Sequence, residues 1–171
     1  SDDIPHPPIE ALFTIDEEIG MGGAHAIDLS LLKGHKLINI DSEEEGFLTT
    51  GCAGGVRIRA EFPVKRENAT GTVMEVKIKG LQGGHSGAEI HKQRGNAHKM
   101  MGRLLKEISS EVCFNLVSVG GGSADNVIAM EDTARILIDG KDADKVTKIA
   151  AQMKEVFDNE FMGDEPGLEV L

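Results

Sequence analysis

The first fifty residues carry short apolar runs separated by acidic and glycine-rich segments. Residues 11–14 and 36–41 are apolar runs of strand length, so the pattern predicts two short buried strands. Between them, residues 24–32 place their apolar side chains on one helical face and predict a short helix. The order strand, helix, strand is typical of a parallel α/β sheet.

A glycine-rich passage with Gly51, Gly54 and Gly55 separates this part from a region with a different pattern. We place a domain boundary there, giving one domain over residues 1–50 and another over residues 51–171. Period-two alternation and amphipathic spacing predict the elements of the second domain. Strands are expected at residues 56–62, 72–81, 112–119 and 134–138, and helices at residues 97–108 and 142–157. The first two strands pair most simply as a hairpin, and the whole predicts an antiparallel sheet with two helices on one face.

Composition narrows the class of protein. The chain has 171 residues, 40% of them hydrophobic, which suits a packed core. Its net charge of −11 disfavours nucleic acid as a partner, because phosphate binding needs a basic face. No apolar run has the length of a membrane span, and the first residues show neither a basic segment nor a hydrophobic signal core. Cys52 and Cys113 lack zinc or disulfide spacing, so we expect a reducing, cytoplasmic setting.

Three acids at the end of the first strand are the first candidate site. Glu17 and Glu18 are neighbours, and adjacent carboxylates repel unless one is protonated or a cation holds them. A solvated acidic turn is the alternative, because isolated carboxylates are usually exposed. Asp41 ends the second strand, and a parallel sheet brings such strand ends to one edge. Together these acids predict part of a metal site, for which magnesium, manganese or zinc would be suitable.

A histidine between glycines is the second candidate. His85 lies in Gly83-Gly84-His85-Ser86-Gly87, directly after a predicted strand. Glycines let the backbone approach a ligand closely, and an imidazole can donate a proton to developing negative charge. A purely structural turn histidine is the alternative. The loop Gly120-Gly121-Gly122 lacks the lysine and spacing of a phosphate loop, and we interpret it as presenting Asn126 for hydrogen bonding.

These motifs carry a resemblance to a known family. Residues 13–21, 37–44 and 80–97 occur in an order similar to the aminoacyl-histidine (Xaa-His) dipeptidases, cytosolic nonspecific dipeptidases of the co-catalytic-metal peptidase family that includes peptidase T and the carnosinases. The resemblance covers nearly the whole chain. It implies that residues 1–50 are the end of a catalytic α/β domain that carries metal-site acids. It also implies that residues 51–171 are an α+β lid or dimerisation domain, incomplete at its C-terminal end.

The resemblance also implies a role for each candidate residue. Glu17 would be the general base that takes a proton from the attacking water, and Glu18 and Asp41 would each ligate one of two divalent metal ions. His85 would stabilise the tetrahedral oxyanion, in related enzymes from a neighbouring subunit, and Asn126 would help to hold a dipeptide substrate. Zinc is the first expectation for the metal, with manganese or cobalt as alternatives.

The chain also departs from this family. The family's His-x-Asp pair, bridging Asp and distant His ligand have no counterpart in the sequence. The chain starts at Ser1 without Met and ends on a strand-like segment, so we expect a fragment of a metallo-dipeptidase that is inactive alone and can be metal-free. A homodimer formed through the lid domain is expected. The alternative function is a self-associating interaction module without catalysis.

Overall fold

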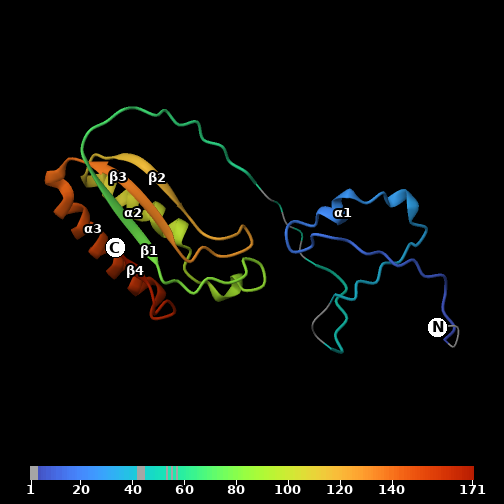
Figure 1. The fold of residues 1–171 in the computed structure, drawn as a ribbon. Helices are drawn as coiled ribbons and strands as arrows, with labels where there is room; N and C mark the ends of the chain where they lie inside the picture. The colour runs from blue at the N-terminus through green and yellow to red at the C-terminus, as the bar shows by residue number, and fades with distance from the viewer. Residues whose placement is uncertain (1–3, 42–44, 53, 55, 57) are drawn as a thin grey trace. The chain divides into compact units, whose positions relative to one another are not determined.

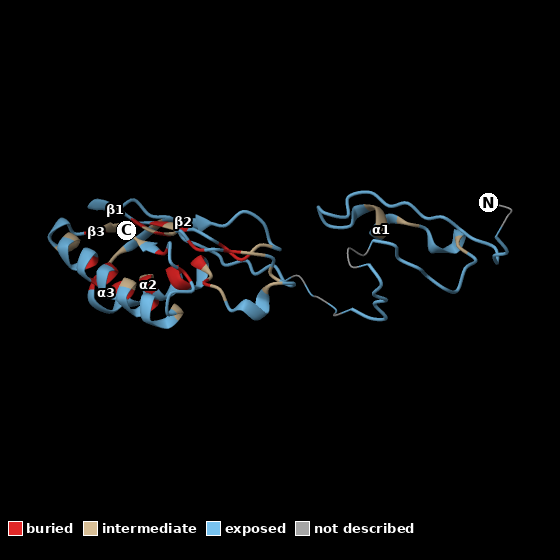
Figure 2. Ribbon diagram, turned by 90° about the horizontal axis from the view of Figure 1, so that it is seen from below, coloured by how far each residue is buried: buried red, intermediate tan, exposed pale blue. Residues whose placement is uncertain are grey.

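Two compact units make up the chain. The computed structural model describes all residues except 1–3, 42–44, 53, 55 and 57, and it divides into Ser1–Glu61 and Phe62–Leu171. The second unit contains all the strands and both long helices of the described residues (Figure 1). Most of the protein's buried side chains are therefore found in the second unit (Figure 2).

A four-stranded antiparallel sheet organises the second unit. The strands are β1 (Thr72–Lys79), β2 (Asn115–Gly121), β3 (Asp132–Ile138) and β4 (Glu169–Val170), and their order in the sheet is β2-β3-β1-β4. In the central β1–β3 pair, Val76 lies opposite Ala134. The β2–β3 ladder shifts register between Leu116 and Ser118. Strands β2 and β4 are thus the two edges of the sheet.

Two helices cover one face of this sheet. They are α2 (Ala97–Glu111) and α3 (Ala143–Phe161), and both lie on the same side of the strands (Figures 1 and 2). The short 3-10 turns are η2 (Ile90–Lys92), which precedes α2, and η3 (Gly140–Asp142), which leads into α3. Helix α2 begins after Asn96, whose side chain accepts a hydrogen bond from the Lys99 amide at 3.2 Å. That contact satisfies one of the amides that a helix leaves free at its start.

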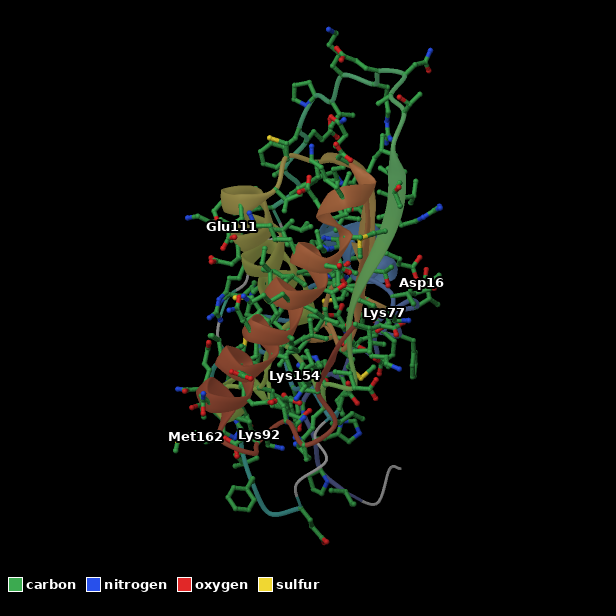
Figure 3. The ribbon with its side chains drawn as sticks, turned by 90° about the vertical axis from the view of Figure 1, so that its left-hand side faces the viewer. Asp16, Lys77, Lys92, Glu111, Lys154 and Met162 are labelled. Carbon is green, nitrogen blue, oxygen red and sulfur yellow. The ribbon has the colours of Figure 1, made fainter. Side chains whose placement is uncertain are left out.

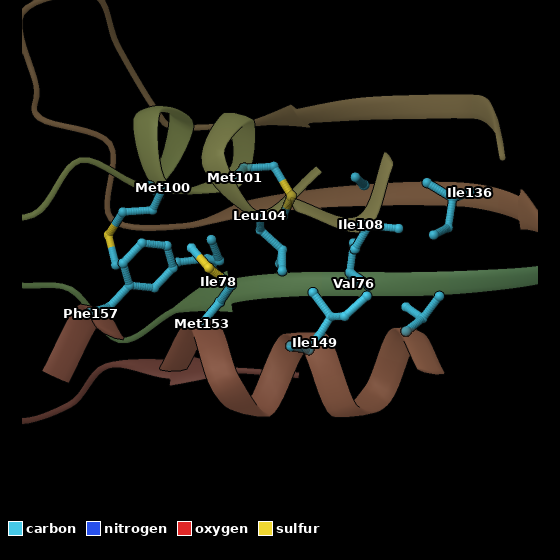
Figure 4. Packing of buried hydrophobic residues seen from close by; sticks show 14 of the residues in the cluster. Val76, Ile78, Met100, Met101, Leu104, Ile108, Ile136, Ile149, Met153 and Phe157 are labelled. Atoms are coloured by element: carbon cyan, nitrogen blue, oxygen red, sulfur yellow. The ribbon is translucent and has the colours of Figure 1, made fainter. Parts of the chain in front are cut away.

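The core lies between the helices and the sheet. Every second residue of β3 is buried, as expected for a strand with one covered face. Figure 4 shows Phe157, Met153 and Ile149 of α3 packed towards β1 and towards side chains of α2. The α2 side chains buried in this layer are Ala97, Met100, Met101, Leu104 and Ile108. Met100 and Met101 are therefore core residues.

Charged side chains surround this core and pair across the surface. Lys154 contacts Asp158 one turn later on α3 at 2.6 Å, and Lys145 joins α3 to Glu111 at the end of α2 at 3.2 Å. Lys154 and Glu111 are labelled on the two helices in Figure 3. Exposed pairs of this kind each contribute little to stability, so burial of apolar surface dominates.

The predicted α+β architecture is confirmed for this unit. Strands near 72–81, 112–119 and 134–138 and helices near 97–108 and 142–157 correspond to β1, β2, β3, α2 and α3. The strand-like C-terminal end corresponds to β4. The strand predicted at residues 56–62 is wrong for the described residues, because β1 pairs with β3 and β4 instead of forming a hairpin with that segment. The predicted hinge glycine Gly55 lies outside the described residues.

The first unit differs more from the prediction. Residues 11–14 and 36–41 form no strand, and the expected helix is reduced to α1 (Gly22–Ala26) and the 3-10 turn η1 (Leu29–Leu31). Buried parallel strands need neighbouring strands and apolar cover on both faces. The described part of this unit supplies neither, and Phe13 and Ile40 are each 91% exposed. Apolar content alone was therefore an insufficient basis for predicting strands there.

Candidate functional site

Two loops of the second unit meet and bring His85 beside Asn126. The His85 loop (residues 82–95) follows β1, and the Asn126 loop (residues 122–131) connects β2 to β3. The Ser86 amide donates to the Asn126 carbonyl at 2.8 Å, and the Ile128 amide donates to the Gly84 carbonyl at 2.8 Å. Between these bonds, His85 and Val127 form an antiparallel bridge. The two candidate residues predicted from separate glycine-rich loops thus lie on adjoining segments.

The imidazole of His85 has a fixed hydrogen-bonding direction. Its Nδ1 atom accepts hydrogen bonds from the backbone amides of Gly87 at 3.0 Å and Ala88 at 3.1 Å. A backbone amide can only donate, so Nδ1 carries no proton and the neutral ring is protonated at Nε2. His85 is exposed, and its Nε2–H can therefore donate to a ligand.

Charged groups inside the His85 loop hold its shape. The Glu89 carboxylate accepts from the His85 amide at 2.9 Å and pairs with Lys92 at 2.6 Å and with Arg94 at 3.4 Å. Two hydrogen bonds lower the pKa of Glu89 to about 2: the one from Lys92 has the larger effect, and the one from the His85 amide adds to it. Arg94 also donates to the Gly83 carbonyl at 2.5 Å, which joins the two halves of the loop.

Gly84 is required by this arrangement. Its φ of 129° lies in a region that residues with a side chain rarely adopt. A Cβ at this position would lie 2.5 Å from Oε2 of Glu89 and 2.6 Å from Nη1 of Arg94. The glycine before His85 therefore lets the backbone pass directly against the ion pair.

Glu165 contacts both ends of the same loop from the segment after α3. This carboxylate is almost fully buried, and it accepts from the Gln82 amide at 2.7 Å and from the Gly95 amide at 2.8 Å. The Gln82 side chain in turn donates to the Asp164 carbonyl. The start and end of the His85 loop are thus joined through one side chain.

A groove of about 830 Å³ lies beside these loops. Its wall includes Ser86 and Arg94 of the His85 loop, Lys99 of α2 and Asp125 of the Asn126 loop. Arg103, also on the wall, is paired with Glu160 at 2.7 Å and lies 4.8 Å over the Phe157 ring. Lys99, which forms no ion pair with any described residue, adds a positive charge to this wall.

His98 at the start of α2 forms a further polar contact. Its Nδ1 lies 2.7 Å from Oδ2 of Asp132, the first residue of β3. This contact with a buried carboxylate places the start of α2 against the end of the Asn126 loop.

The predicted metal-site acids belong to the first unit. Glu17 and Glu18 are exposed in a turn of the first unit, and Asp41 is exposed with its amide bound to the Asn39 side chain at 3.1 Å. Their carboxylates make no hydrogen bond or ion pair within the described residues. Nowhere in the described chain are three acidic, histidine or cysteine side chains close enough to hold a metal ion. The donors among the described residues therefore do not by themselves form a two-metal centre. Glu43 and Glu44 lie outside the described residues.

Sequence reasoning missed the residues that support the His85 loop. Glu89 and Arg94 lie within the motif, but their pairing depends on a fold of the loop that periodicity does not describe. Glu165 is separated from Gln82 by 83 residues, so no local pattern could connect them. Asp132 could have been noticed as an acid on the buried side of a strand, which requires a partner.

Comparisons with known proteins find relatives of this chain by sequence and by fold. A sequence profile described as "Peptidase dimerisation domain" matches residues 76–165. Over 172 aligned residues the chain is 36% identical to the cytosol non-specific dipeptidase of Escherichia coli (strain K12), covering 99% of this chain and 36% of the relative. The crystal structure of aminoacylhistidine dipeptidase from Vibrio alginolyticus matches with a TM-score of 0.69 and 35% identity, covering 92% of this chain and 33% of that protein. The chain thus spans about a third of the length of either relative. No helix of its described residues is both long and apolar enough to cross a membrane.

Proposed function

Since this chain belongs to the peptidase dimerisation domain family, we propose that its second unit is the lid of a metal-dependent dipeptidase and presents His85 to the substrate. The observation that carries this proposal is the pair of hydrogen bonds that Nδ1 of His85 accepts. Two backbone amides occupy Nδ1, which leaves the exposed Nε2–H to donate. A donor held in place before the reaction is what a developing oxyanion requires.

Each candidate residue then has a chemical task. Nε2–H of His85 donates to the carbonyl oxygen of the scissile peptide as that oxygen gains negative charge. Asn126, beside it, holds the dipeptide by hydrogen bonding, and the adjoining groove accommodates the rest of the substrate. Glu17 transfers the proton of the attacking water. Residues 1–50 would belong to the catalytic domain, where Glu18 and Asp41 would each supply a ligand to divalent metal ions, with zinc as the first expectation.

The names of two relatives indicate the substrates and the cellular location that we propose. The two similar proteins are named as a cytosol non-specific dipeptidase and an aminoacylhistidine dipeptidase, so we propose dipeptides, including Xaa-His, as substrates in the cytoplasm.

Many large apolar side chains of the first unit are exposed. Because exposed apolar patches usually mark interfaces, we propose that further residues of the protein cover them and complete the catalytic domain.

A mutation in the protein that contains this chain tests the role of His85. His85→Ala should lower kcat by about a hundredfold with little change in KM, as expected when one oxyanion donor is removed. His91→Ala is the matched control, because His91 is an exposed histidine of the same loop and its side chain has no partner among the described residues. Unchanged kcat in His85→Ala would overturn the proposal.

The 171-residue chain alone should not hydrolyse dipeptides. Its described residues bring too few metal-binding side chains together, and a site with so few ligands binds metal weakly. An assay with added zinc or manganese checks this expectation, and robust turnover would contradict it.

Self-association is the second proposed function, and strand β2 favours it. This strand is an edge of the sheet, and Leu116 and Val119 on it are each about half exposed. An edge strand offers unpaired backbone groups that a second copy can pair with. We therefore propose a homodimer formed through the second unit. The two functions are compatible, since a lid that pairs two chains can also cover a substrate.

A further inference from the structure

We propose that Glu165 is a positioning residue for His85, because its carboxylate joins the two ends of the loop that carries the imidazole. Oε2 of Glu165 accepts from the Gln82 amide at 2.7 Å, and Oε1 accepts from the Gly95 amide at 2.8 Å. These amides begin and end the His85 loop. One side chain thereby fixes the separation of the two ends.

The burial of Glu165 indicates a specific role. Only 5% of its surface is exposed, and burying a carboxylate is costly unless hydrogen bonds replace water. No described residue forms an ion pair with it, so the two amides supply the compensation. Charge-assisted bonds of this type are stronger than neutral ones. A buried acid whose two oxygens each hold one end of a loop is a strong constraint on that loop.

The neighbouring backbone is shaped to receive this carboxylate. Gly95 is buried, and a Cβ there would lie 3.0 Å from Cδ2 of Leu81 and 3.4 Å from Oε1 of Glu165. The Gln82 side chain donates to the Asp164 carbonyl, next to Glu165 in the chain. The segment after α3 is therefore held against both ends of the loop.

The constraint reaches His85 through contacts inside the loop. Arg94, next to Gly95, donates to the Gly83 carbonyl, and Gly83 follows Gln82. Glu89 pairs with Arg94 and accepts from the His85 amide at 2.9 Å. A change in the separation of Gln82 and Gly95 would therefore disturb the turn that directs two amides at Nδ1 of His85. The effect on catalysis rests on the proposed function, but the effect on the imidazole does not.

Nuclear magnetic resonance on the 171-residue chain tests the effect on the imidazole. The variants are Glu165→Ala, which removes both acceptors, and Glu165→Gln, which keeps one amide oxygen. Glu155→Gln on α3 is the matched control, because Glu155 is exposed and has no partner among the described residues. The readouts are hydrogen exchange of the Gln82, Gly87, Ala88 and Gly95 amides and the imidazole nitrogen shifts of His85.

In Glu165→Ala these amides should exchange about tenfold faster or more, the loss expected for one hydrogen bond to a charged group. The His85 nitrogen shifts should move away from the Nε2–H tautomer, while Ala134 and Ile136 in β3 keep their protection. The exchange rates and His85 shifts of Glu165→Gln should lie between those of Glu165→Ala and the wild type. This variant provides the test if Glu165→Ala does not fold. Unchanged His85 shifts in a folded variant would overturn the proposal, since Glu165 would then stabilise only its own segment.

Kinetics of the dipeptidase that contains this chain separate this proposal from the proposed function. Glu165→Ala should lower kcat more than it raises KM, and it should have little further effect in a His85→Ala background. Equal effects in the two backgrounds would show that Glu165 acts independently of His85 and would overturn the proposal. Altered His85 shifts together with unchanged kcat in both single variants would support the positioning role and contradict the proposed function.

Discussion

At the residue scale, Asp132 is an acid buried in the second unit with His98 as its hydrogen-bond partner. Asp132 is 3% exposed, and its Oδ2 lies 2.7 Å from Nδ1 of His98. Its Oδ1 accepts no hydrogen bond from the described residues. Loss of His98 would thus leave a buried carboxylate without a donor, which costs more than removing both partners together.

We expect His98→Ala to lower the free energy of unfolding by about 2 kcal/mol. Asp132→Asn should cost less, because its neutral amide is easier to bury and can still accept from His98. Combining the two changes should therefore cost less than the sum of the single effects. Urea denaturation measures all three values. Additive losses would contradict a role for His98 as the partner of Asp132.

Glu89 makes the His85 loop sensitive to acid. Its pKa is lowered from 4.5 to about 2, mainly by hydrogen bonds from Lys92 and the His85 amide. The folded loop therefore favours the ionised form, and this contribution is complete above pH 4.5 and is lost as the pH falls to about 2. The melting temperature of Glu89→Gln should lie below that of the wild type at pH 5, and this difference should shrink towards pH 2. A difference that does not change with pH would exclude Glu89 ionisation as its cause.

At the element scale, the sequence predicted those elements whose pattern repeats over several turns or strand positions. Helices α2 and α3 have apolar faces long enough to identify, and the alternation in β1 and β3 corresponds to one covered face. Residues 56–62 have the same alternation but form no strand in the described chain, because alternation does not specify a hydrogen-bonded neighbour. The glycine motifs singled out His85 and Asn126 as candidates, whereas the contacts of Glu165 could be seen only in the folded chain.

Strand β2 is the edge of the sheet at which we expect a second copy of the chain to bind. Val119 is 49% exposed and lies opposite the buried Ala134, so a second copy at this edge would cover it. Val119→Lys should weaken self-association by about tenfold or more, because a lysine would have to be desolvated there. Val156→Lys is the control, since Val156 is 45% exposed but lies on α3. Sedimentation velocity measures both variants, and equal weakening would exclude β2 as the interface.

At the scale of the whole molecule, the two units differ in whether they have a packed core and in whether they bring their candidate residues together. The second unit has a closed core and presents His85 and Asn126 together. The first carries Glu17, Glu18 and Asp41 on exposed segments that form no metal cluster in the described chain. These acids could be proposed from the sequence as candidate metal ligands, but their convergence depends on a sheet that the described residues do not form. The proposed enzyme therefore needs the second unit to supply the hydrogen-bond donor His85, and it needs further residues to complete its metal ligands.

The most direct test of this account is subunit complementation in the protein that contains this chain. Glu17→Gln and His85→Ala each remove one proposed catalytic group, so each homodimer should be inactive. If each lid serves the neighbouring subunit, a mixed dimer regains one intact site, and equal mixing should restore about a quarter of wild-type activity. Recovery of dipeptide hydrolysis after subunit exchange is the predicted result. No recovery, although mixed dimers are demonstrated by differential tagging, would contradict a dimeric dipeptidase whose lid donates His85 to its partner.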